Sequence, residues 1–541
     1  MHYALQRIRQ PSTRQAFEAR SCLRASGRVS TVKTGLRLAV VMITMVLVAL
    51  GCDSTGAGGG GDDPDTGPYA VSGTVTEDGS GVGIEGVEVS FTGGHTPVTT
   101  DSGGEWSMSG LSGAVTVTPT LDDWTFDPPA FLVDGPSDSV DFSGTEPGIS
   151  FAGGDGTPGD PYQVATAAQL NEIRNYLSDH FVLTDDIDLS AYTDGDGWAP
   201  IGPTFWGSYD GAGHTISGLF IDRSGDKTGL FAESGGEIQN VTLTGVNITA
   251  DGNWVGALAG TNSGTIENCT VDGTVTLTDG GQAGGLVGHN GGTITNSESN
   301  VAVFGAFMVG GLTGNNSGTI ADSFATGPVN GPVAGGSGNR VGGLAGLNSG
   351  LISDSYATGL VTFDADGFGI GGLVGTSEGS VVRSYATGNV VASGDVWYIG
   401  GLIGENLSEV EDSYATGDVT GHNSVGGFVG LNQFVEAIIS RCYSYGAVTA
   451  TGSNLGGFAG QSLDSSTIEA SYWDTDASAI EESAGGEGRT TSQMQAGTSG
   501  AYISPDGSVD GDEEPENLMY NGWDDLGVWD FGTATDYPVL R

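Results

Sequence analysis

A five-residue phrase of glycine and apolar residues returns at regular intervals through the second half of the chain. It reads Gly-x-Leu-x-Gly, with Phe in place of Leu in the last two copies, and it begins at Gly256, Gly284, Gly310, Gly342, Gly371, Gly400, Gly426 and Gly456. Successive copies start 28, 26, 32, 29, 29, 26 and 30 residues apart. A recurring period of this length is a signature of repeat architectures. We therefore predict that this half of the chain is built from stacked copies of one unit.

Apolar residues occupy fixed positions within each repeat, counted from its first glycine as position 0. Position 2 comprises Leu258, Leu286, Leu312, Leu344, Leu373, Leu402, Phe428 and Phe458. Position 10 comprises Ile266, Ile294, Ile320, Ile352, Val381, Val410, Ile439 and Ile468, if the last two copies take insertions of three and two residues. There is no helical period, so each repeat is predicted to hold two or three strands of four to six residues. Because such strands are unstable alone, we predict an all-β fold, a right-handed parallel β-helix with eight coils over residues 256–470.

Position 6 of the repeat is almost always asparagine. It comprises Asn262, Asn290, Asn316, Asn348, Asn406 and Asn432, with Ser377 and Ser462 as exceptions. Asparagine tolerates left-handed backbone geometry and can turn the chain. Coils stacked at about 4.8 Å would also let the amides form a hydrogen-bonded ladder. A structural ladder is the favoured interpretation, and a polar binding groove formed by the same column is the alternative.

Position 12 carries charges of alternating sign in the middle of the repeat region. Asp354, Arg383, Asp412 and Arg441 stand there in consecutive coils. Opposite charges on neighbouring strands attract modestly. We therefore predict an exposed electrostatic ladder, and not a catalytic cluster.

Two cysteines share position 13, but they belong to distant repeats. Cys269 and Cys442 lie six coils apart, which is about 29 Å at ~4.8 Å per coil. A disulfide requires Cα atoms within about 7 Å. The one-coil-per-repeat arrangement therefore predicts two free, buried thiols.

The regions on either side of the repeats have different patterns. Residues 69–146 contain short alternating strands separated by Gly and Asp turns, which predicts a small antiparallel β-sandwich. Residues 149–255 are predicted to form an N-terminal cap helix, begun by Thr166, and the first coils of the β-helix. Aromatic residues concentrated in 471–541 predict a C-terminal cap over the last coil, with an exposed carbohydrate-binding platform as the alternative.

The first 51 residues have the pattern of a secretory signal. Basic residues precede an apolar run of 13 residues, Leu38 to Leu50, which is shorter than the ~20 that span a membrane as a helix. The run ends Ala49-Leu50-Gly51-Cys52, which resembles the bacterial lipobox except that Ala49 stands where Leu is usual. The resemblance implies lipidation of Cys52, followed by a flexible tether over residues 52–68. An ordinary cleaved signal with an incidental cysteine is the alternative.

The charge balance restricts the partners of the chain. The net charge is -50, and eight of the 16 basic residues lie in the first 51 positions. Such an acidic surface repels the phosphate backbone, so nucleic acid is not an expected partner. The expected partners are a membrane, through the lipid anchor, and an extracellular glycan or another cell surface. The expected location is the cell envelope, on the outer membrane surface, or outside the cell.

Two segments resemble known families. The phrases Gly-Gly-Leu-Val-Gly, Asn-Ser-Gly-x-Ile and Asp-Ser-Tyr-Ala-Thr-Gly (354–359 and 412–417) resemble GLUG-motif repeats. That resemblance covers about 200–470 and implies a bacterial surface protein, because GLUG repeats occur in adhesin-like proteins and some immunoglobulin A peptidases. Residues 69–146 resemble transthyretin-like or carboxypeptidase-regulatory-like modules, which are usually stalks or spacers.

No catalytic motif accompanies the repeats. The sequence contains no HExxH, no GxSxG elbow and no P-loop. We therefore predict no catalytic, metal or cofactor-binding residue, and expect a non-catalytic, surface-anchored scaffold for adhesion or ligand binding. The alternative is a polysaccharide lyase or hydrolase, for which Arg383 and Arg441 are the basic candidates in the repeats. A weak calcium-loop resemblance from Asp506 to Asp512 lacks its closing Glu, since Asn517 stands there.

Overall fold

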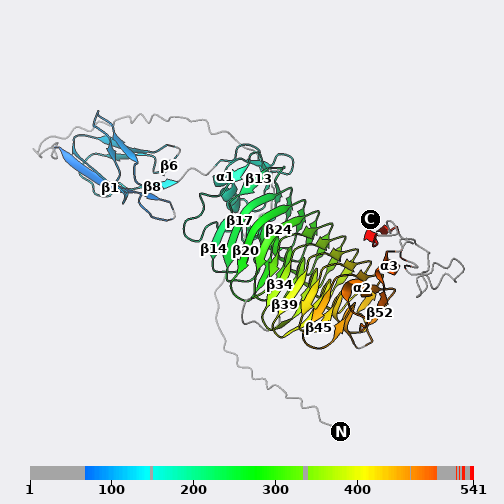
Figure 1. Ribbon diagram of the computed structural model, residues 1–541. Coiled ribbons are helices and arrows are strands. Elements are labelled where there is room, and N and C mark those ends of the chain that lie inside the picture. Colours follow the sequence, from blue (N-terminus) through cyan, green and yellow to red (C-terminus); the bar gives the residue numbers. More distant parts are fainter. Residues whose placement is uncertain are drawn as a thin grey trace, which may run out of the picture. The chain divides into compact units, whose positions relative to one another are not determined.

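The computed structural model describes residues 68–541 except 79, 123, 146–149, 333–338, 464, 496–519, 521–522, 524–526 and 531–535. The chain divides into two compact units near residue 145. The first is a small all-β unit, and the second contains the repeats, drawn from cyan to orange in Figure 1.

The first unit consists of two four-stranded sheets. One contains β4 (Glu105–Leu111), β1 (Tyr69–Glu77), β8 (Phe142–Thr145) and β6 (Thr125–Asp127), and the other contains β3 (Val98–Thr99), β2 (Glu88–Phe91), β5 (Val115–Thr120) and β7 (Phe131–Val133). Their rings meet across the sheets, since Phe91 lies 5.9 Å from Trp106, and Phe131 lies 5.5 Å from Phe142. The pairing differs from the fully antiparallel prediction, because β1 and β8 run parallel.

The predicted cap helix is present but short. Helix α1 (Ala167–Glu172) begins at Thr166, whose side chain accepts a hydrogen bond from the backbone N–H of Gln169. It continues as a 3-10 turn, η1 (Ile173–Asn175). Leu170 and Ile173 are fully buried in the core of the second unit, as the apolar stripe predicted. Two further short helices, α2 (Thr475–Ser478) and α3 (Thr491–Met494), were not predicted.

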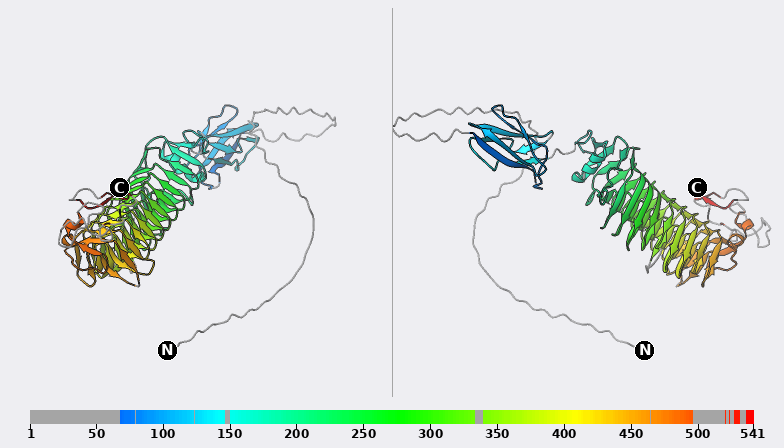
Figure 2. Two further views of the ribbon diagram at one scale, coloured as in Figure 1. Left: turned by 90° about the vertical axis from the view of Figure 1, so that its right-hand side faces the viewer. Right: turned by 60° about the vertical axis from the view of Figure 1, so that its left-hand side comes forward.

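The repeats form a parallel β-helix, as predicted, with one coil per repeat. Four parallel sheets run along its axis: a twelve-stranded sheet from β9 (Tyr162–Val164) to β52 (Thr467–Glu469), an eighteen-stranded sheet from β11 (Ile187–Asp188) to β54 (Glu487–Arg489), and two smaller ones. The nine-stranded sheet contains β15 (Phe231–Ser234), β18 (Ala259–Asn262), β22 (Val287–Asn290), β26 (Thr313–Asn316), β31 (Ala345–Asn348), β36 (Val374–Ser377), β41 (Ile403–Asn406), β46 (Val429–Asn432) and β51 (Ala459–Ser462). The seven-stranded sheet contains β21 (Gln282–Gly284), β25 (Met308–Gly310), β30 (Arg340–Gly342), β35 (Gly367–Gly371), β40 (Val396–Gly400), β45 (Asn423–Gly426) and β50 (Leu455–Gly456). Figure 2 shows these coils from two further sides.

From the coil that begins at Gly310 onward, the coils contain more strands than predicted, and most of these strands are shorter. The coil that begins with β30 and β31 continues through β32 (Leu351–Ser353), β33 (Tyr356–Ala357) and β34 (Val361–Asp364). Its five strands are two to four residues long, where two or three strands of four to six residues were expected. The reason is that the path of the coil bends after each short apolar segment, which alternation along the sequence does not reveal.

The glycines of the repeated phrase allow backbones to approach closely. A Cβ at Gly284 would lie 2.1 Å from the carbonyl oxygen of Val287, and one at Gly288 would lie 2.4 Å from the backbone nitrogen of Val255. Real Cβ atoms do not come this close, so only glycine fits. Every Leu or Phe at position 2 is fully buried, which confirms that this position fills the interior.

The column of asparagines at position 6 forms the predicted ladder. Nδ2 of Asn262 donates to Oδ1 of Asn290 at 2.8 Å, and the bond repeats from Asn290 to Asn316 and from Asn316 to Asn348. The left-handed turn, however, lies at position 12, where φ is about 50° in Asn268 and in every later coil. The asparagine column is therefore an internal structural ladder, and not a turn or an open binding groove.

Candidate functional site

Several predicted features lie outside the described residues. These are the signal segment 1–51, Cys52, the tether apart from its last residue, and the calcium-like stretch from Asp506 to Asn517. Within the described part of the chain, no helix is long and apolar enough to cross a membrane. In that same part, no group of three or more His, Cys, Asp or Glu side chains is arranged to hold a metal ion.

The two repeat cysteines are buried and free, as predicted. Desolvation raises the pKa of the Cys269 thiol to about 12, and it raises the pKa of Cys442 as well. Reactive cysteines need a populated thiolate. These two thiols are therefore inert filling of the core.

The alternating charges at position 12 form two separate ion pairs. Arg383 makes a bidentate contact with Asp354, with both nitrogen–oxygen distances at 2.6 Å. Arg441 makes the same contact with Asp412, at 2.7 and 2.9 Å. The predicted partners are thus confirmed within each pair. The two basic candidates for a lyase are both engaged in these contacts.

The second ion pair is covered, which contradicts the prediction of a wholly exposed ladder. The Asp354 and Arg383 side chains are 36% and 39% exposed, whereas Asp412 is only 4% exposed. The indole N–H of Trp529 donates to Oδ1 of Asp412 at 3.0 Å, and Glu411 also contacts Arg441. The C-terminal segment, red in Figure 2, therefore lies against this coil.

An aromatic column runs along the outer side of the eighteen-stranded sheet. Its rings are nearly parallel, with centroids 4.6, 4.8, 4.7 and 5.1 Å apart, and they belong to Phe324, Tyr356, Tyr385, Tyr414 and Tyr443. The ring faces contact one another, so between neighbours the column presents edges and hydroxyl groups. We call these five rings the aromatic ladder. Stacking of this kind adds about 0.5–1.5 kcal/mol per pair beyond area burial, so its first role is structural.

The described aromatic residues after 519 cluster beside the aromatic ladder, and most of them are buried. Trp523 and Trp529 are 1% and 0% exposed, and both contact Tyr443. The prediction of a cap over the last coil is therefore correct in part, because Trp473 joins the main core while these tryptophans cover a flank. Buried rings of this kind offer no exposed platform to a sugar, which removes that alternative for them. A cavity of about 450 Å³ remains between Tyr414, Tyr445 and Tyr537.

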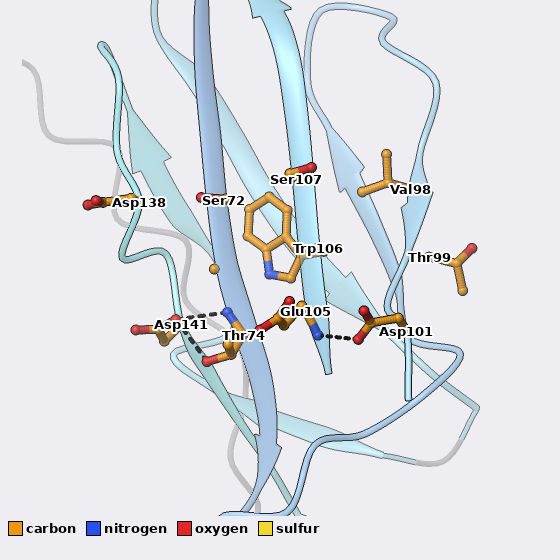
Figure 3. Close-up of a pocket in the computed structure, with 11 residues that line it drawn as sticks. Ser72, Thr74, Val98, Thr99, Asp101, Glu105, Trp106, Ser107, Asp138 and Asp141 are labelled. Atoms are coloured by element: carbon orange, nitrogen blue, oxygen red, sulfur yellow. Dashed lines mark hydrogen bonds between the residues drawn. The ribbon is translucent and has the colours of Figure 1, made fainter. Parts of the chain in front are cut away.

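The first unit has a cavity of about 560 Å³ beside β1 and β4, shown in Figure 3. Four carboxylates line it, those of Asp101, Glu105, Asp138 and Asp141. Two of them brace the backbone: Asp141 accepts from the N–H and hydroxyl of Thr74, and Asp101 accepts from the N–H of Glu105. These hydrogen bonds stabilise a turn and a strand edge, so we assign the two carboxylates a structural role.

A row of polar side chains follows the corner where the seven-stranded and nine-stranded sheets meet. One side of the corner is position 5, the residue before the asparagine ladder, and the other side lies two residues before position 0. Opposite members face each other, since Nζ of Lys227 lies 2.5 Å from Oε2 of Glu233. A Cβ at Gly369 would lie 2.8 Å from Oγ1 of Thr376, so the two sides of the corner also face each other five coils later.

We call these two facing columns of side chains the polar corner. Its position 5 members are Glu233, Thr261, His289, Asn315, Leu347, Thr376 and Glu405, and its other members are Lys227, Trp254, Gln282, Met308, Arg340, Gly369 and Tyr398. Five buried side-chain atoms of the corner lack a hydrogen-bond partner: Oγ1 of Thr261, Oε1 of Gln282, Nδ1 of His289, Oδ1 of Asn315 and Nε of Arg340. Trp254 is partly exposed and has a left-handed backbone with φ 64°.

Glu405 closes the downstream end of the polar corner. Its side chain accepts a hydrogen bond from Nε2 of Gln433 at 2.7 Å, and it is 9% exposed. Desolvation raises the pKa of this carboxyl, while the positive charge of Arg340 opposes the rise. Burial likewise lowers the pKa of His289, so the imidazole is held in its neutral form.

Sequence reasoning missed both the polar corner and the aromatic ladder. It also left Arg340 out of the basic residues of the repeats. The ladder had a signal, because Phe or Tyr recurs at position 14 in six consecutive repeats. The corner had almost none, since the side chains on its two sides vary from coil to coil.

The comparisons with known proteins concern the repeats. A family model described as the GLUG motif matches residues 252–276 and 395–420. A candidate Gly-rich membrane protein of Evansella cellulosilytica is 48% identical over 124 residues, which is 21% of this chain and 14% of that protein. Halomucin of Haloquadratum walsbyi is 44% identical over 127 residues, which is 20% of this chain and 1% of that protein. The matched segments thus span a small part of either relative.

Among solved structures, a candidate immunoglobulin A1 protease from Bacteroides ovatus aligns with 72% of this chain and 95% of its own, at 18% identity. The TM-score of 0.35 is too low to support any conclusion about this chain. The matches and the fold together identify the repeated unit: this chain carries GLUG motifs, and it folds them as coils of a parallel β-helix.

Proposed function

We propose that this chain is a lipid-anchored protein of the cell surface whose β-helix presents binding surfaces and performs no catalysis. The observation that carries the proposal is the apolar run that ends in Ala49-Leu50-Gly51-Cys52. A cysteine at this place suits lipid attachment, and an acidic, glycine-rich tether follows it. The relatives support a surface or membrane location by their names, one as a Gly-rich membrane protein and the other as halomucin.

The geometry of the repeats supports a non-catalytic role. A lyase needs a basic side chain that is free to remove a proton near the substrate. Arg383 and Arg441 each hold a carboxylate in a bidentate contact. Removing a proton would require breaking that contact, so these arginines serve structure.

The anchor is tested by labelling growing cells with a radioactive fatty acid. The wild-type chain is expected to carry the label, and Cys52→Ser is expected to lose it and to leave the membrane fraction. Cys22→Ser is the matched control, because that cysteine precedes the expected processing site, and its label should be unchanged. Labelling that persists in Cys52→Ser would contradict the proposal.

The absence of catalysis is tested with the purified chain. Incubation with acidic and neutral polysaccharides is expected to produce no new reducing ends and no unsaturated ends. Sustained release of either product by the wild-type chain would instead establish a hydrolase or a lyase. Arg383→Ala and Arg441→Ala would then show whether the paired arginines take part.

A further inference from the structure

The polar corner contains a run of buried polar atoms that lack a hydrogen-bond partner. Among the buried side-chain atoms in the described part of the chain that lack a hydrogen-bond partner, five lie in this corner between Thr261 and Arg340. Each such atom costs about 1–3 kcal/mol unless something outside the protein bonds to it. Thr261 is only 8% exposed, so a ligand atom or an ordered water must reach in to satisfy its hydroxyl.

The spacing of these atoms indicates the shape of the missing partner. Thr261, His289 and Asn315 are direct neighbours on β18, β22 and β26, so they repeat once per coil. Gln282, Met308 and Arg340 repeat in the same way on β21, β25 and β30. Parallel strands lie about 4.8 Å apart. A partner that meets all of these groups is therefore a linear chain that lies along the axis of the β-helix.

The chemistry of the corner indicates what the linear chain is made of. The five unpartnered atoms include acceptors on Gln282 and Asn315, a donor on Arg340, and a hydroxyl on Thr261 that does both. Hydroxyl groups, which donate and accept, match such a mixture. Lys227 is already paired with Glu233 at one end, and Arg340 lies near Glu405 at the other, so little positive charge is free for an anionic chain.

Trp254 adds an apolar surface at the upstream end of the same row. It lies next to Lys227 in register and precedes Gln282 by one coil. The left-handed backbone of Trp254, φ 64°, recurs at Lys227, Gly369 and Tyr398 of the same column and belongs to the turn of the coil. A partly exposed indole beside polar groups is a usual feature of small-molecule and sugar-sized sites.

We propose that the polar corner from Trp254 to Arg340 binds a neutral, linear glycan strand along the axis of the β-helix. The sugar hydroxyls bond to Thr261, Gln282, His289, Asn315 and Arg340, and one sugar ring rests on Trp254. This inference rests on the proposed binding function and names its ligand class and its site. It needs neither the lipid anchor nor the aromatic ladder.

The test is calorimetric titration of the purified full chain, carrying Cys52→Ser to keep it free of lipid. The probes are linear hexasaccharides of β-linked glucose, xylose, mannose and N-acetylglucosamine, with the matching disaccharides. At least one hexasaccharide is expected to bind, and its disaccharide about tenfold or more weaker, because several coils each contribute a hydrogen bond. Trp254→Ala and Asn315→Ala are each expected to weaken binding about tenfold, and Trp254→Tyr to weaken it less.

Asn300→Ala is the matched control, since Asn300 lies on the outer side of another sheet, where it bonds Thr326. Far-ultraviolet circular dichroism and the urea midpoint verify that each variant is folded. The inference is overturned if no hexasaccharide binds the wild-type chain, if binding survives Trp254→Ala and Asn315→Ala, or if only uronic acid hexasaccharides, added as a further probe, bind. Those outcomes leave the anchor at Cys52 intact, whereas loss of lipid labelling alone would leave this assay unaffected.

Discussion

Two rows of polar side chains occupy adjacent positions on the same strands, and the protein treats them in opposite ways. Asn290 and Asn316 point inward and bond to each other at 2.8 Å. His289 and Asn315, one residue earlier, face outward at the polar corner, and each keeps a buried atom without a partner. Because successive side chains of a strand point to opposite faces, the hydrogen-bonded asparagine ladder and the polar corner lie only one residue apart.

The difference shows that burial and hydrogen bonding are set separately in this fold. In the interior, each asparagine of the ladder donates a hydrogen bond to the asparagine of the next coil, so no buried amide is left without a partner along Asn262, Asn290 and Asn316. At the corner the side chains differ from coil to coil, so only some of them bond to one another, as Lys227 does to Glu233 and Thr376 to Glu405. The polar corner has one side chain per coil at a regular spacing, but its polar groups differ. Such an arrangement suits the binding of another molecule.

The largest expected loss of stability comes from breaking the buried Asp412–Arg441 ion pair, and the exposed Asp354–Arg383 pair is its comparison. Asp412→Ala is expected to lower the free energy of unfolding by about 3 kcal/mol or more, because Arg441 and Trp529 lose a shared buried acceptor. Asp354→Ala, which removes the exposed pair with Arg383, should cost about 1 kcal/mol or less. Urea denaturation followed by tryptophan fluorescence measures both. Equal losses would show that the C-terminal segment does not cover Asp412.

The next effect compares the two rows directly. Asn316→Ala is expected to destabilise the β-helix by about 2 kcal/mol, because Asn290 and Asn348 each lose a buried partner. Asn315→Ala, on the same strand, should change the urea midpoint little, since its carbonyl has no protein partner to lose. A larger loss from Asn315→Ala than from Asn316→Ala would contradict the assignment of the two rows.

The smallest effect concerns the acid at the end of the polar corner. The folded state raises the pKa of Glu405, mainly through desolvation, so the folded protein binds more protons than the unfolded chain above the usual carboxyl pKa of about 4.3. Stability from this group therefore falls as pH rises through that window. Glu405→Gln should gain stability relative to the wild-type chain between pH 5 and pH 8.

The urea midpoint at the two pH values measures that gain, and Glu237→Gln, at an exposed glutamate, is the control. The groups that face Glu405 are Arg340, Thr376, Gln433 and Glu378, and they are the same in both proteins compared. A Glu405→Gln variant whose relative stability falls from pH 5 to pH 8 would show that Arg340 outweighs burial.

Much of the fold follows from the sequence because the repeat fixes the register. One coil per repeat, the asparagine ladder, the buried leucines and the free cysteines were all predicted from position alone. The covered ion pair was not, because Trp529 approaches Asp412 from 117 residues away and no local pattern indicates it. The polar corner was missed for a different reason: Lys227 and Glu233 are six residues apart, but their contact depends on how the chain bends between two sheets.

We propose that the unpartnered polar atoms of the polar corner bind a linear glycan. A crystal structure of the chain soaked with the tightest hexasaccharide tests this most directly. We expect density for a sugar chain along the corner, with one ring on Trp254 and hydroxyls within hydrogen-bond distance of Thr261 Oγ1 and Asn315 Oδ1. Density for isolated waters alone at these atoms, or a sugar chain bound elsewhere on the molecule, would contradict it.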